Sequence, residues 1–201
     1  IMCVLVFNGK EIPKEKELVT EVTKKFPEVK TIVKNINTQN TNVVMGKENI
    51  VIYGSGYIKD QLGKYIFKIS PHSFYQVNPI QAENLYNIGV QAANISKNDI
   101  VFDLYCGIGT ISLFMAQYAK KVYGIEIVEE AIQDAKENAK INNIENAEFI
   151  AGDVENVLDD LINVKKVIPD VIMIDPPRKG MDNKSVENIL NIKPKKLVYI
   201  S

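Results

Sequence analysis

The sequence predicts a doubly wound α/β fold, in which helices cover both faces of a parallel sheet, preceded by a smaller α+β domain. Two observations predict the sheet. From residue 100 onward, short apolar runs typical of strands alternate with amphipathic segments typical of helices, and the chain ends on a fifth strand-like run. These runs are apolar throughout, as in strands buried on both faces of a parallel sheet. A third observation, several short strand-like runs separated by turns, predicts the α+β domain over residues 1–75.

The N-terminal domain should contain one helix among its strands. Leu18, Val22 and Phe26 repeat at helical spacing within residues 13–26, and an apolar strand around Cys3 precedes this segment. Asn-rich and Gly-rich turns separate the strands that we expect after it. These strands are predicted at residues 30–37, 41–45, 49–54, 56–60 and 64–70.

The second domain, residues 76–201, should open with a well-capped helix. Asn78 is a suitable N-cap, Pro79 suits the first helical position, and Gln81 stands where a capping box needs it. The crevice of such a fold lies at the carboxyl ends of the strands. Further strands are predicted at residues 99–105, 120–126, 147–153, 169–175 and 195–201, and helices at 110–118, 128–141, 154–162 and 183–190.

Composition excludes several classes of protein. The formal net charge is −1, which argues against indiscriminate nucleic-acid binding, and we expect no DNA partner. No apolar run is long enough for a membrane span, so we expect a cytoplasmic protein without a membrane partner. Two distant cysteines predict neither disulfides nor a metal site. Because the chain starts at Ile1 and stops at Ser201 after a strand-like run, we interpret it as a piece of a longer protein, of unknown oligomeric state.

The stretch VFDLYCGIGT, residues 101–110, is the first candidate binding loop. Tyr105 follows a strand, and Gly107 and Gly109 would let the backbone turn closely around a ligand. Glu126 ends the next strand at about the distance where nucleotide folds place a carboxylate on ribose hydroxyls. A plain strand-to-helix turn is the alternative, but the loop and the carboxylate together favour an adenosine-type ligand. Ser112 stands where a dinucleotide fingerprint needs Gly or Ala, which disfavours a nicotinamide cofactor.

Two further strand ends carry carboxylates. Asp153 follows the third strand, where it could accept a hydrogen bond from an adenine amine or equally cap the next helix. The fourth strand ends in IDPPRKG, in which two prolines stiffen a loop that presents Asp175 at the crevice. Arg178 and Lys179 in this loop could reach phosphate groups.

These motifs, with SPHSFYQVN at residues 70–78, resemble the S-adenosylmethionine-dependent RNA uracil-5-methyltransferases, most closely the bacterial enzymes acting on large-subunit ribosomal RNA. The resemblance implies a Rossmann-like fold, S-adenosylmethionine as cofactor, ribosomal RNA as partner, and an RNA-recognition role for residues 1–75. Asp175 and Arg178 are expected to face the substrate. Gly107 joins the cofactor set as the turn glycine; by resemblance the other cofactor positions are Gln76, Tyr105, Thr110, Glu126, Asp153 and Asp175.

The resemblance also implies the reaction. In the family, a cysteine thiolate adds to carbon 6 of a flipped-out uracil and makes carbon 5 nucleophilic toward the methyl donor. That cysteine follows the strand that here ends at Ser201, and the proton-abstracting glutamate lies farther on. Neither Cys3, which we expect in the core, nor Cys106 in the cofactor loop is therefore assigned as catalytic. The 201 residues should bind the cofactor without being an efficient enzyme.

Other interpretations remain open from the sequence. They are a nucleic-acid amino-methyltransferase, a nicotinamide-dependent oxidoreductase and a non-catalytic RNA-binding module. Several side chains are expected to be structurally ordinary: His72 as a solvated loop residue, Phe74 and Tyr75 as packing residues. The same holds for the lysine pairs before three strands, expected to be solvated: 120/121, 165/166 and 195/196.

Overall fold

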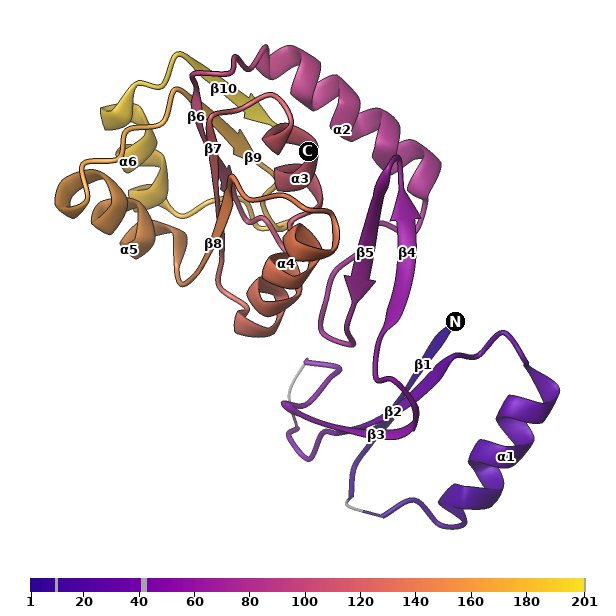
Figure 1. Cartoon of the computed structure of the whole chain (residues 1–201). Helices are drawn as coiled ribbons and strands as arrows, with labels where there is room; N and C mark the ends of the chain where they lie inside the picture. The colour runs from indigo at the N-terminus through magenta and orange to yellow at the C-terminus, as the bar shows by residue number, and fades with distance from the viewer. Residues whose placement is uncertain (10, 41–42, 201) are drawn as a thin grey trace. The chain divides into compact units, whose positions relative to one another are not determined.

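The structure, a computed structural model, describes residues 1–9, 11–40 and 43–200. The chain divides into two compact units (Figure 1). The first unit comprises Ile1–Asp60 and Lys68–His72. The second unit comprises Gln61–Phe67 and Ser73–Ser201. One β-hairpin is therefore shared, because its tip belongs to the second unit and its base to the first.

A three-stranded sheet with one helix forms the first unit. Strands β1 (Met2–Phe7) and β2 (Thr31–Ile36) are parallel and are joined by helix α1 (Glu15–Lys25), and β3 (Glu48–Gly54) pairs antiparallel with β2. Central strand β2 is almost entirely buried. Its Lys34 forms a largely buried ion pair with Glu15 of α1, with 2.8 Å between Nζ and Oε2. The predicted helix is confirmed, although no residue of α1 is fully buried.

The strand predicted at residues 41–45 is wrong where the structure describes it. Residues 43–45 form an irregular loop, whereas Thr41 and Asn42 lie outside the described residues. The Asn37 side chain donates hydrogen bonds to the carbonyl oxygens of Val43 and Val44, at 2.8 and 3.0 Å. Asparagine amides compete with ladder hydrogen bonds in this way, so an apolar pair in an asparagine-rich segment need not form a strand.

The hairpin of β4 (Ile58–Leu62) and β5 (Tyr65–Ile69) carries its tip into the second unit. There Asn142 binds the backbone of Ile66 twice: Oδ1 accepts from the Ile66 N–H at 2.9 Å and Nδ2 donates to its carbonyl at 2.7 Å. Tyr65 packs on Phe114, with ring centroids 5.1 Å apart. The tip is thus fixed by one side-chain amide and one aromatic pair.

A five-stranded, wholly parallel sheet organises the second unit, in the order β10-β9-β6-β7-β8. Helices α2, α3 and α4 cover one face, and α5 and α6 cover the other (Figure 1), as a doubly wound fold requires. The strands are β6 (Ile100–Leu104), β7 (Lys121–Glu126), β8 (Ala147–Ala151), β9 (Val171–Ile174) and β10 (Lys196–Tyr199). The helices are α2 (Pro79–Ala93), α3 (Thr110–Ala116), α4 (Glu129–Ile141), α5 (Val154–Asp159) and α6 (Asn183–Ile192).

Helix ends follow the local chemistry. Asn78 caps α2 as predicted, since its Oδ1 accepts a hydrogen bond from the Gln81 N–H at 3.2 Å and Pro79 opens the helix. The helix predicted over 154–162 instead ends as an α-helix at Asp159 and continues as a π-turn through Asp160–Val164. Ser201, predicted to end the last strand, lies outside the described residues.

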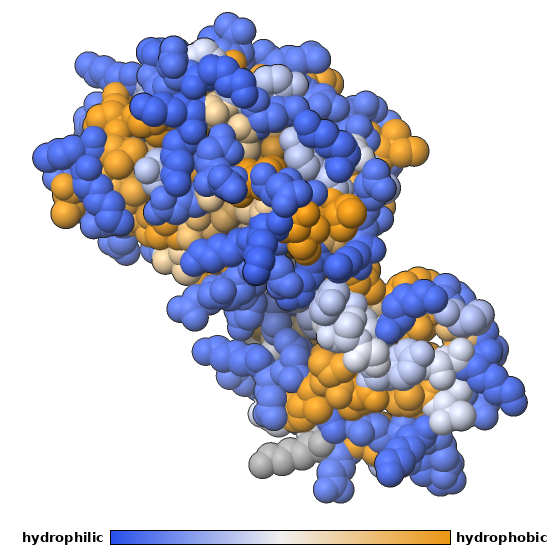
Figure 2. All heavy atoms as spheres, viewed as in Figure 1, coloured by the Kyte–Doolittle hydropathy of each residue, from blue (hydrophilic) through white to orange (hydrophobic). Residues whose placement is uncertain are grey.

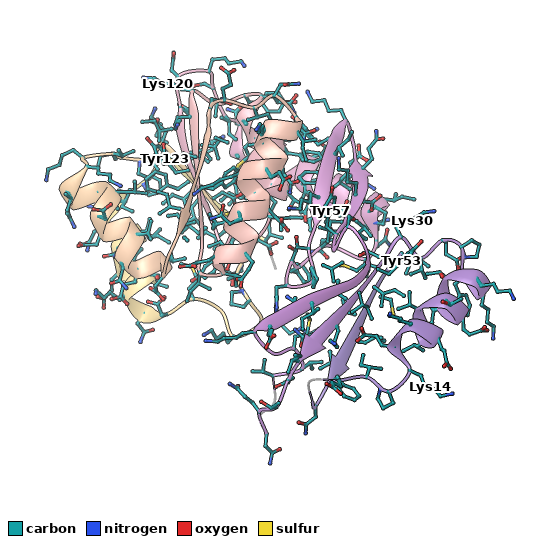
Figure 3. All side chains as sticks on the ribbon, turned by 60° about the horizontal axis from the view of Figure 1, so that its bottom comes forward. Lys14, Lys30, Tyr53, Tyr57, Lys120 and Tyr123 are labelled. Atoms are coloured by element: carbon teal, nitrogen blue, oxygen red, sulfur yellow. The ribbon has the colours of Figure 1, made fainter. Side chains whose placement is uncertain are left out.

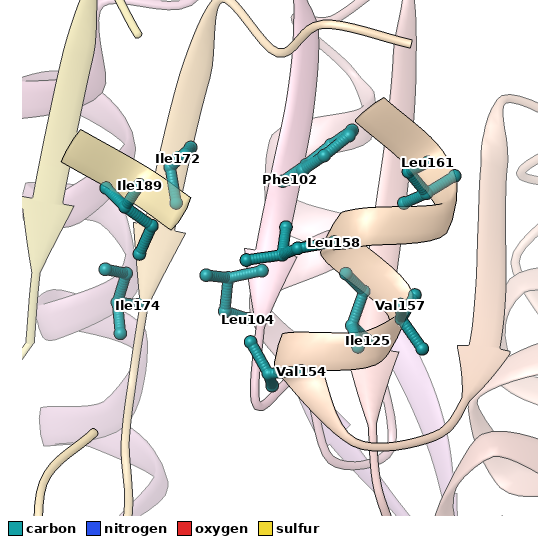
Figure 4. Close-up of a cluster of buried hydrophobic side chains, with 10 residues drawn as sticks. All are labelled: Phe102, Leu104, Ile125, Val154, Val157, Leu158, Leu161, Ile172, Ile174 and Ile189. Carbon is teal, nitrogen blue, oxygen red and sulfur yellow. The ribbon is translucent and has the colours of Figure 1, made fainter. Parts of the chain in front are cut away.

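A cluster of buried apolar side chains lies between the sheet and helices α5 and α6 (Figure 4). Leu158 is completely buried there, and Leu161 is 1% exposed. Because these side chains pack helices α5 and α6 against the strands, they help to fix the positions of the strand ends and of the loops that follow them. The cluster consists of Phe102, Leu104, Ile125, Val154, Val157, Leu158, Leu161, Ile172, Ile174 and Ile189.

Apolar side chains are also exposed on both units, seen as orange spheres among blue ones in Figure 2. Among the described residues, no helix is both long and apolar enough to cross a membrane.

Candidate functional site

The loop after β6 combines one open and one tightly packed glycine. Tyr105 and Gly107 both have positive φ, at 65° and 53°. A Cβ built on Gly107 meets nothing within 4 Å, so this backbone faces open space. A Cβ on Gly109, where φ is 81°, would lie 2.9 Å from the ring of Phe149. Gly109 therefore allows packing, whereas Gly107 leaves the loop accessible to a ligand.

Glu126 connects the two loops at this edge of the sheet. Its Oε2 accepts a hydrogen bond from the Gly107 N–H at 3.2 Å, and its Oε1 accepts one from the Val128 N–H at 3.1 Å. Glu126, which the sequence predicts to bind ribose hydroxyls, therefore contacts the glycine loop directly. A carboxylate held in this way has a fixed orientation and further lone pairs to offer a ligand.

Asp103 is the most unusual group in the second unit. It is completely buried; Oδ2 accepts a hydrogen bond from the Ser112 hydroxyl, and Oδ1 has no partner among the described residues. Burial, with further contributions from the nearby carboxylates of Asp175 and Glu126, raises the pKa of Asp103 to about 7. An unpaired buried carboxylate oxygen marks a place for a donor or a cation.

Tyr86 lies near Asp103 and Asp175 and hydrogen-bonds to two of the predicted cofactor residues. Its side chain is 3% exposed, and its hydroxyl shares hydrogen bonds with Thr110 and Gln76. Burial raises the pKa of the Tyr86 phenol, as do the charges of Asp175 and Asp103. The phenol is therefore un-ionised at neutral pH and can keep its hydrogen bonds.

Asp175 lies at the end of β9, where burial raises its pKa above the usual range. It is not the cap of helix α6. That position is taken by Asp182, whose Oδ1 accepts a hydrogen bond from the Ser185 N–H at 2.7 Å. A purely structural capping role for Asp175 is thus excluded, and its carboxylate remains with Asp103 and Glu126.

A second group forms around Tyr105. Its side chain hydrogen-bonds to Ser185, and burial raises its pKa, helped by the nearby carboxylates of Asp182 and Asp153. Asp153 caps α5, since its Oδ1 accepts from the Glu155 N–H at 3.0 Å. The capping role that the sequence left open for Asp153 is therefore observed. This does not exclude ligand contact through its other oxygen.

Arg178 belongs to the exposed loop that follows Asp175. Pro176 and Pro177 are both trans, and Gly180 has a φ of 77° with nothing within 4 Å of an added Cβ. The guanidinium is solvent-exposed and stays available for an external anion.

Neither cysteine resembles an activated nucleophile. Cys106 is 6% exposed, and burial, together with the charge of Asp103, raises its pKa well above that of a free thiol. Cys3, which we expected in the core, is only half-buried, because β1 is the edge strand of its sheet.

Expectations for the segment before α2 need two corrections. The Nε2 atom of His72 is buried without a hydrogen-bond partner among the described residues, so this histidine is not the solvated side chain predicted. Phe74 is 74% exposed and does not pack, whereas Tyr75 does, with its ring centroid 6.3 Å from that of Phe67.

Of the six lysines predicted to be solvated as pairs before three strands, four are exposed, whereas Lys121 and Lys196, the first residues of β7 and β10, are half-buried. One member of each pair finds a surface carboxylate: Lys121 with Glu148, Lys165 with Asp160, and Lys195 with Asp170, at 3.1, 2.9 and 2.7 Å. Such exposed pairs add little to stability.

Taken together, the carboxyl edge of the sheet presents Asp103, Glu126 and Asp175 around an open glycine loop. Burial raises the pKa of both Asp103 and Asp175, and a cluster of carboxylates of this kind suits a cationic ligand. No group of three or more His, Cys, Asp or Glu side chains in the described part of the chain has the arrangement of a metal site.

Comparison with known proteins agrees with this geometry. Residues 95–196 match the family model described as "Methyltransferase domain". A protein of Oceanobacillus iheyensis, named an uncharacterized RNA methyltransferase, is 51% identical over 201 residues, covering all of this chain and 44% of that protein. One from Clostridium tetani with the same name is 48% identical with the same coverage. The chain thus spans less than half the length of these relatives.

Solved structures share the fold over both units. The Pyrococcus abyssi tRNA (uracil-54, C5)-methyltransferase in complex with S-adenosyl-L-homocysteine has a TM-score of 0.73 and 25% identity, covering 98% of this chain and 45% of that one. A Methanocaldococcus jannaschii tRNA m1G37 methyltransferase has a TM-score of 0.59 at 21% identity, covering 96% and 56%, and shows the fold alone. The family model matches half of the residues of this chain, and the carboxyl edge of its parallel sheet carries the glycine loop and the carboxylates described above. The chain therefore belongs to the methyltransferase domain family.

Proposed function

We propose that this chain is part of an S-adenosylmethionine-dependent enzyme that methylates carbon 5 of uracil in large-subunit ribosomal RNA. The observation that carries the proposal is the likeness to a tRNA uracil-C5 methyltransferase over 98% of the chain, first unit included. The curated relatives, named RNA methyltransferases over all 201 residues, support RNA as the substrate.

The residues at the carboxyl edge fit S-adenosylmethionine. Its α-ammonium and sulfonium groups are cationic, and Oδ1 of buried Asp103 is an acceptor that has no hydrogen-bond partner among the described residues. Glu126 is oriented by two backbone N–H groups and can accept from ribose hydroxyls. The open backbone at Gly107 leaves room for a ligand. When bound, S-adenosylmethionine supplies an electrophilic methyl group.

The other residues of the proposed site position the cofactor and the substrate and take no part in bond making or breaking. Tyr86 holds Gln76 and Thr110 by hydrogen bonds, and Asp175 ends a strand at a loop stiffened by two prolines. In the proposal, Asp175 and Arg178 contact the flipped uridine and its backbone, and Asp153 contacts the adenine. Fixed side chains of this kind lower the entropic cost of bringing the two reactants together.

The proposal places the nucleophile outside these 201 residues. Activating carbon 5 of uracil requires a thiolate that adds at carbon 6. Cys106 is buried with a raised pKa, and Cys3 is a half-buried residue of strand β1 in the first unit. A cysteine following Ser201 in the intact protein completes the site in this proposal.

Release of tritium from RNA labelled at carbon 5 of uridine tests the reaction directly, since only substitution at that carbon releases the label. The intact protein with S-adenosylmethionine should release tritium from large-subunit ribosomal RNA and less from transfer RNA. The 201-residue chain should bind S-adenosylmethionine in calorimetry and release none.

Two results would contradict the proposal in different ways. Methyl transfer from labelled S-adenosylmethionine without tritium release would place the methyl group on another atom, as in an amino-methyltransferase. Preferential tritium release from transfer RNA would retain the chemistry and change the substrate.

A further inference from the structure

Asp103 lies on the face of β6 opposite the apolar cluster under α5 and α6. Its neighbours Phe102 and Leu104 belong to that cluster, and because side chains alternate between the two faces of a strand, Asp103 faces the helices of the other side. There the Ser112 hydroxyl of α3 donates a hydrogen bond to its Oδ2, and Ser112 is itself completely buried. A carboxyl group is thus enclosed where a strand of a parallel sheet ordinarily carries an apolar side chain.

The titratable groups that face Asp103 are all weak acids. Burial raises the pKa of Asp103 most, and the charges of Asp175, which follows β9, and of Glu126, at the end of β7, raise it further. The charge of Asp103 in turn raises the pKa of Tyr86 on α2 and of Cys106 in the loop after β6. Helix α3 carries no titratable side chain. Every element packed around Asp103 therefore disfavours its ionised form or leaves it unaffected by charge.

These carboxylates lack a positive partner in the part of the chain that the structure describes. No lysine, arginine or histidine there forms an ion pair with Asp103, Glu126 or Asp175. Lys120 and Lys121 stand at the amino end of β7, the end opposite Glu126, and Lys120 lies at the surface in Figure 3. The three carboxylates are therefore neutralised by protons or by a cationic ligand.

We propose that the buried Asp103–Ser112 pair couples cofactor binding to proton release, because the Asp103 carboxyl group gives up a proton when the cationic end of S-adenosylmethionine binds beside it. Ser112 holds Oδ2, which leaves Oδ1, without a partner among the described residues, for the ligand. The O–H bond of the carboxyl group breaks, the proton passes to the solvent, and the positive charge of the ligand replaces it; nothing is oxidised or reduced. This inference rests on the proposed function, since it takes S-adenosylmethionine as the ligand, and adds proton linkage to that site.

Isothermal calorimetry of the 201-residue chain with S-adenosylmethionine at pH 6 counts the protons, when it is repeated in buffers with different heats of ionisation. Because the pKa of Asp103 is about 7, release of about 0.9 proton per bound molecule is expected at pH 6. Affinity should rise about eightfold from pH 5.5 to pH 6.5. The α-ammonium group of the ligand keeps its proton in this range, since α-amino groups titrate near pH 8.

Two variants test the assignment to Asp103. Asp103→Asn removes the carboxyl group, so it should bind without proton release, and its affinity should change less than about twofold between pH 5.5 and pH 6.5. Ser112→Ala keeps the carboxyl group but removes a hydrogen bond that favours the ionised form. It should still release a proton, and its affinity should level off at a higher pH than that of the parent chain.

Matched controls come from the same strand and from the ligand. Asp99 is 9% exposed and stands four residues before Asp103, next to the amino end of β6, so Asp99→Asn should release as many protons as the parent chain. The analogue 5′-methylthioadenosine carries the adenosyl group but neither cationic group, and it should bind without proton release. Circular dichroism shows whether each variant is folded.

The outcomes separate this inference from the proposed function. If the parent chain does not bind S-adenosylmethionine, the proposed cofactor site is overturned and the inference with it. Binding without proton release at pH 6, or equal release by the parent chain and Asp103→Asn, overturns the proton linkage alone. Equal release with 5′-methylthioadenosine overturns the assignment to the cationic end of the ligand. Release by the parent chain and Asp99→Asn, but not by Asp103→Asn, supports both proposals.

Discussion

At the scale of single residues, Asp103 couples stability to pH. Its pKa of about 7 in the folded chain exceeds the value of about 3.9 for an unfolded aspartate. Between these values the folded chain holds one more proton than the unfolded chain. Stability therefore falls as the pH rises from about 4 to about 7, by at most ~1.4 kcal/mol per pH unit from this group.

Asp103→Asn removes this titration while keeping an oxygen for the Ser112 hydroxyl. Urea unfolding between pH 4 and pH 8 should show a flatter stability profile than that of the parent chain. Above pH 7 the variant should be the more stable of the two, because it buries no charge. Affinity for S-adenosylmethionine should fall in the same variant. A profile that matches the parent chain would mean that Asp103 does not titrate in this range.

Glu126 carries the second residue-scale prediction. Glu126→Ala should weaken S-adenosylmethionine binding by about 1.5–3 kcal/mol, because charge-assisted hydrogen bonds to the ribose are lost. Isothermal calorimetry measures the change. Glu129→Ala, an exposed carboxylate three residues on, is the control and should bind normally. Equal affinity in both variants would place the ribose elsewhere.

The spacing of residues along the chain predicts some of the site residues, whereas others can be recognised only in the folded structure. The glycine loop and Glu126 could be assigned to one ligand from the sequence, because the two strand ends of a βαβ unit meet at one edge. The hydrogen bond between Glu126 and Gly107 is seen only in the folded chain. Tyr86 could not, since its role depends on which face of α2 turns toward Thr110 and Gln76. Ser112 was noted only for breaking a glycine pattern, and its hydrogen bond to Asp103 requires the folded loop.

At the scale of elements, strands of the parallel sheet were predictable because each is a short apolar run between polar turns. The strand at 41–45 failed because side-chain amides outside the run decide its backbone pairing. The π-turn after α5 failed for another reason: apolar residues continue through Leu161, so the hydrophobic pattern carries no stop signal there.

Asn142 tests how the hairpin tip is held in the second unit. Asn142→Ala removes both hydrogen bonds to Ile66 and leaves its N–H exposed to water. We expect a loss of about 1–3 kcal/mol in unfolding free energy. Hydrogen exchange at the Ile66 amide should be much faster. Asn191→Ala, on the exposed side of α6, should change neither quantity. Unaltered exchange at Ile66 would show that the aromatic contact of Tyr65 suffices.

At the scale of the whole molecule, the two compact units carry different charges and different cores. The second unit holds fourteen basic residues and eighteen carboxylates, an excess of four negative charges. Its acidic edge suits a cationic cofactor, whereas the basic first unit suits a polyanion. The near-neutral net charge of the chain is therefore the sum of a basic first unit and an acidic second unit.

Separate cores imply that the units can be destabilised separately. Leu158 is fully buried between α5 and the sheet, and Leu158→Ala should cost ~2–5 kcal/mol by leaving a cavity. Native-state hydrogen exchange should then accelerate in β6 and β9 of the second unit but not in β2 of the first. Leu190→Ala, at a side chain 66% exposed, is the matched control and should cost less than ~0.5 kcal/mol. Equal acceleration in β2 and β6 would instead show one cooperative unit running through the shared hairpin.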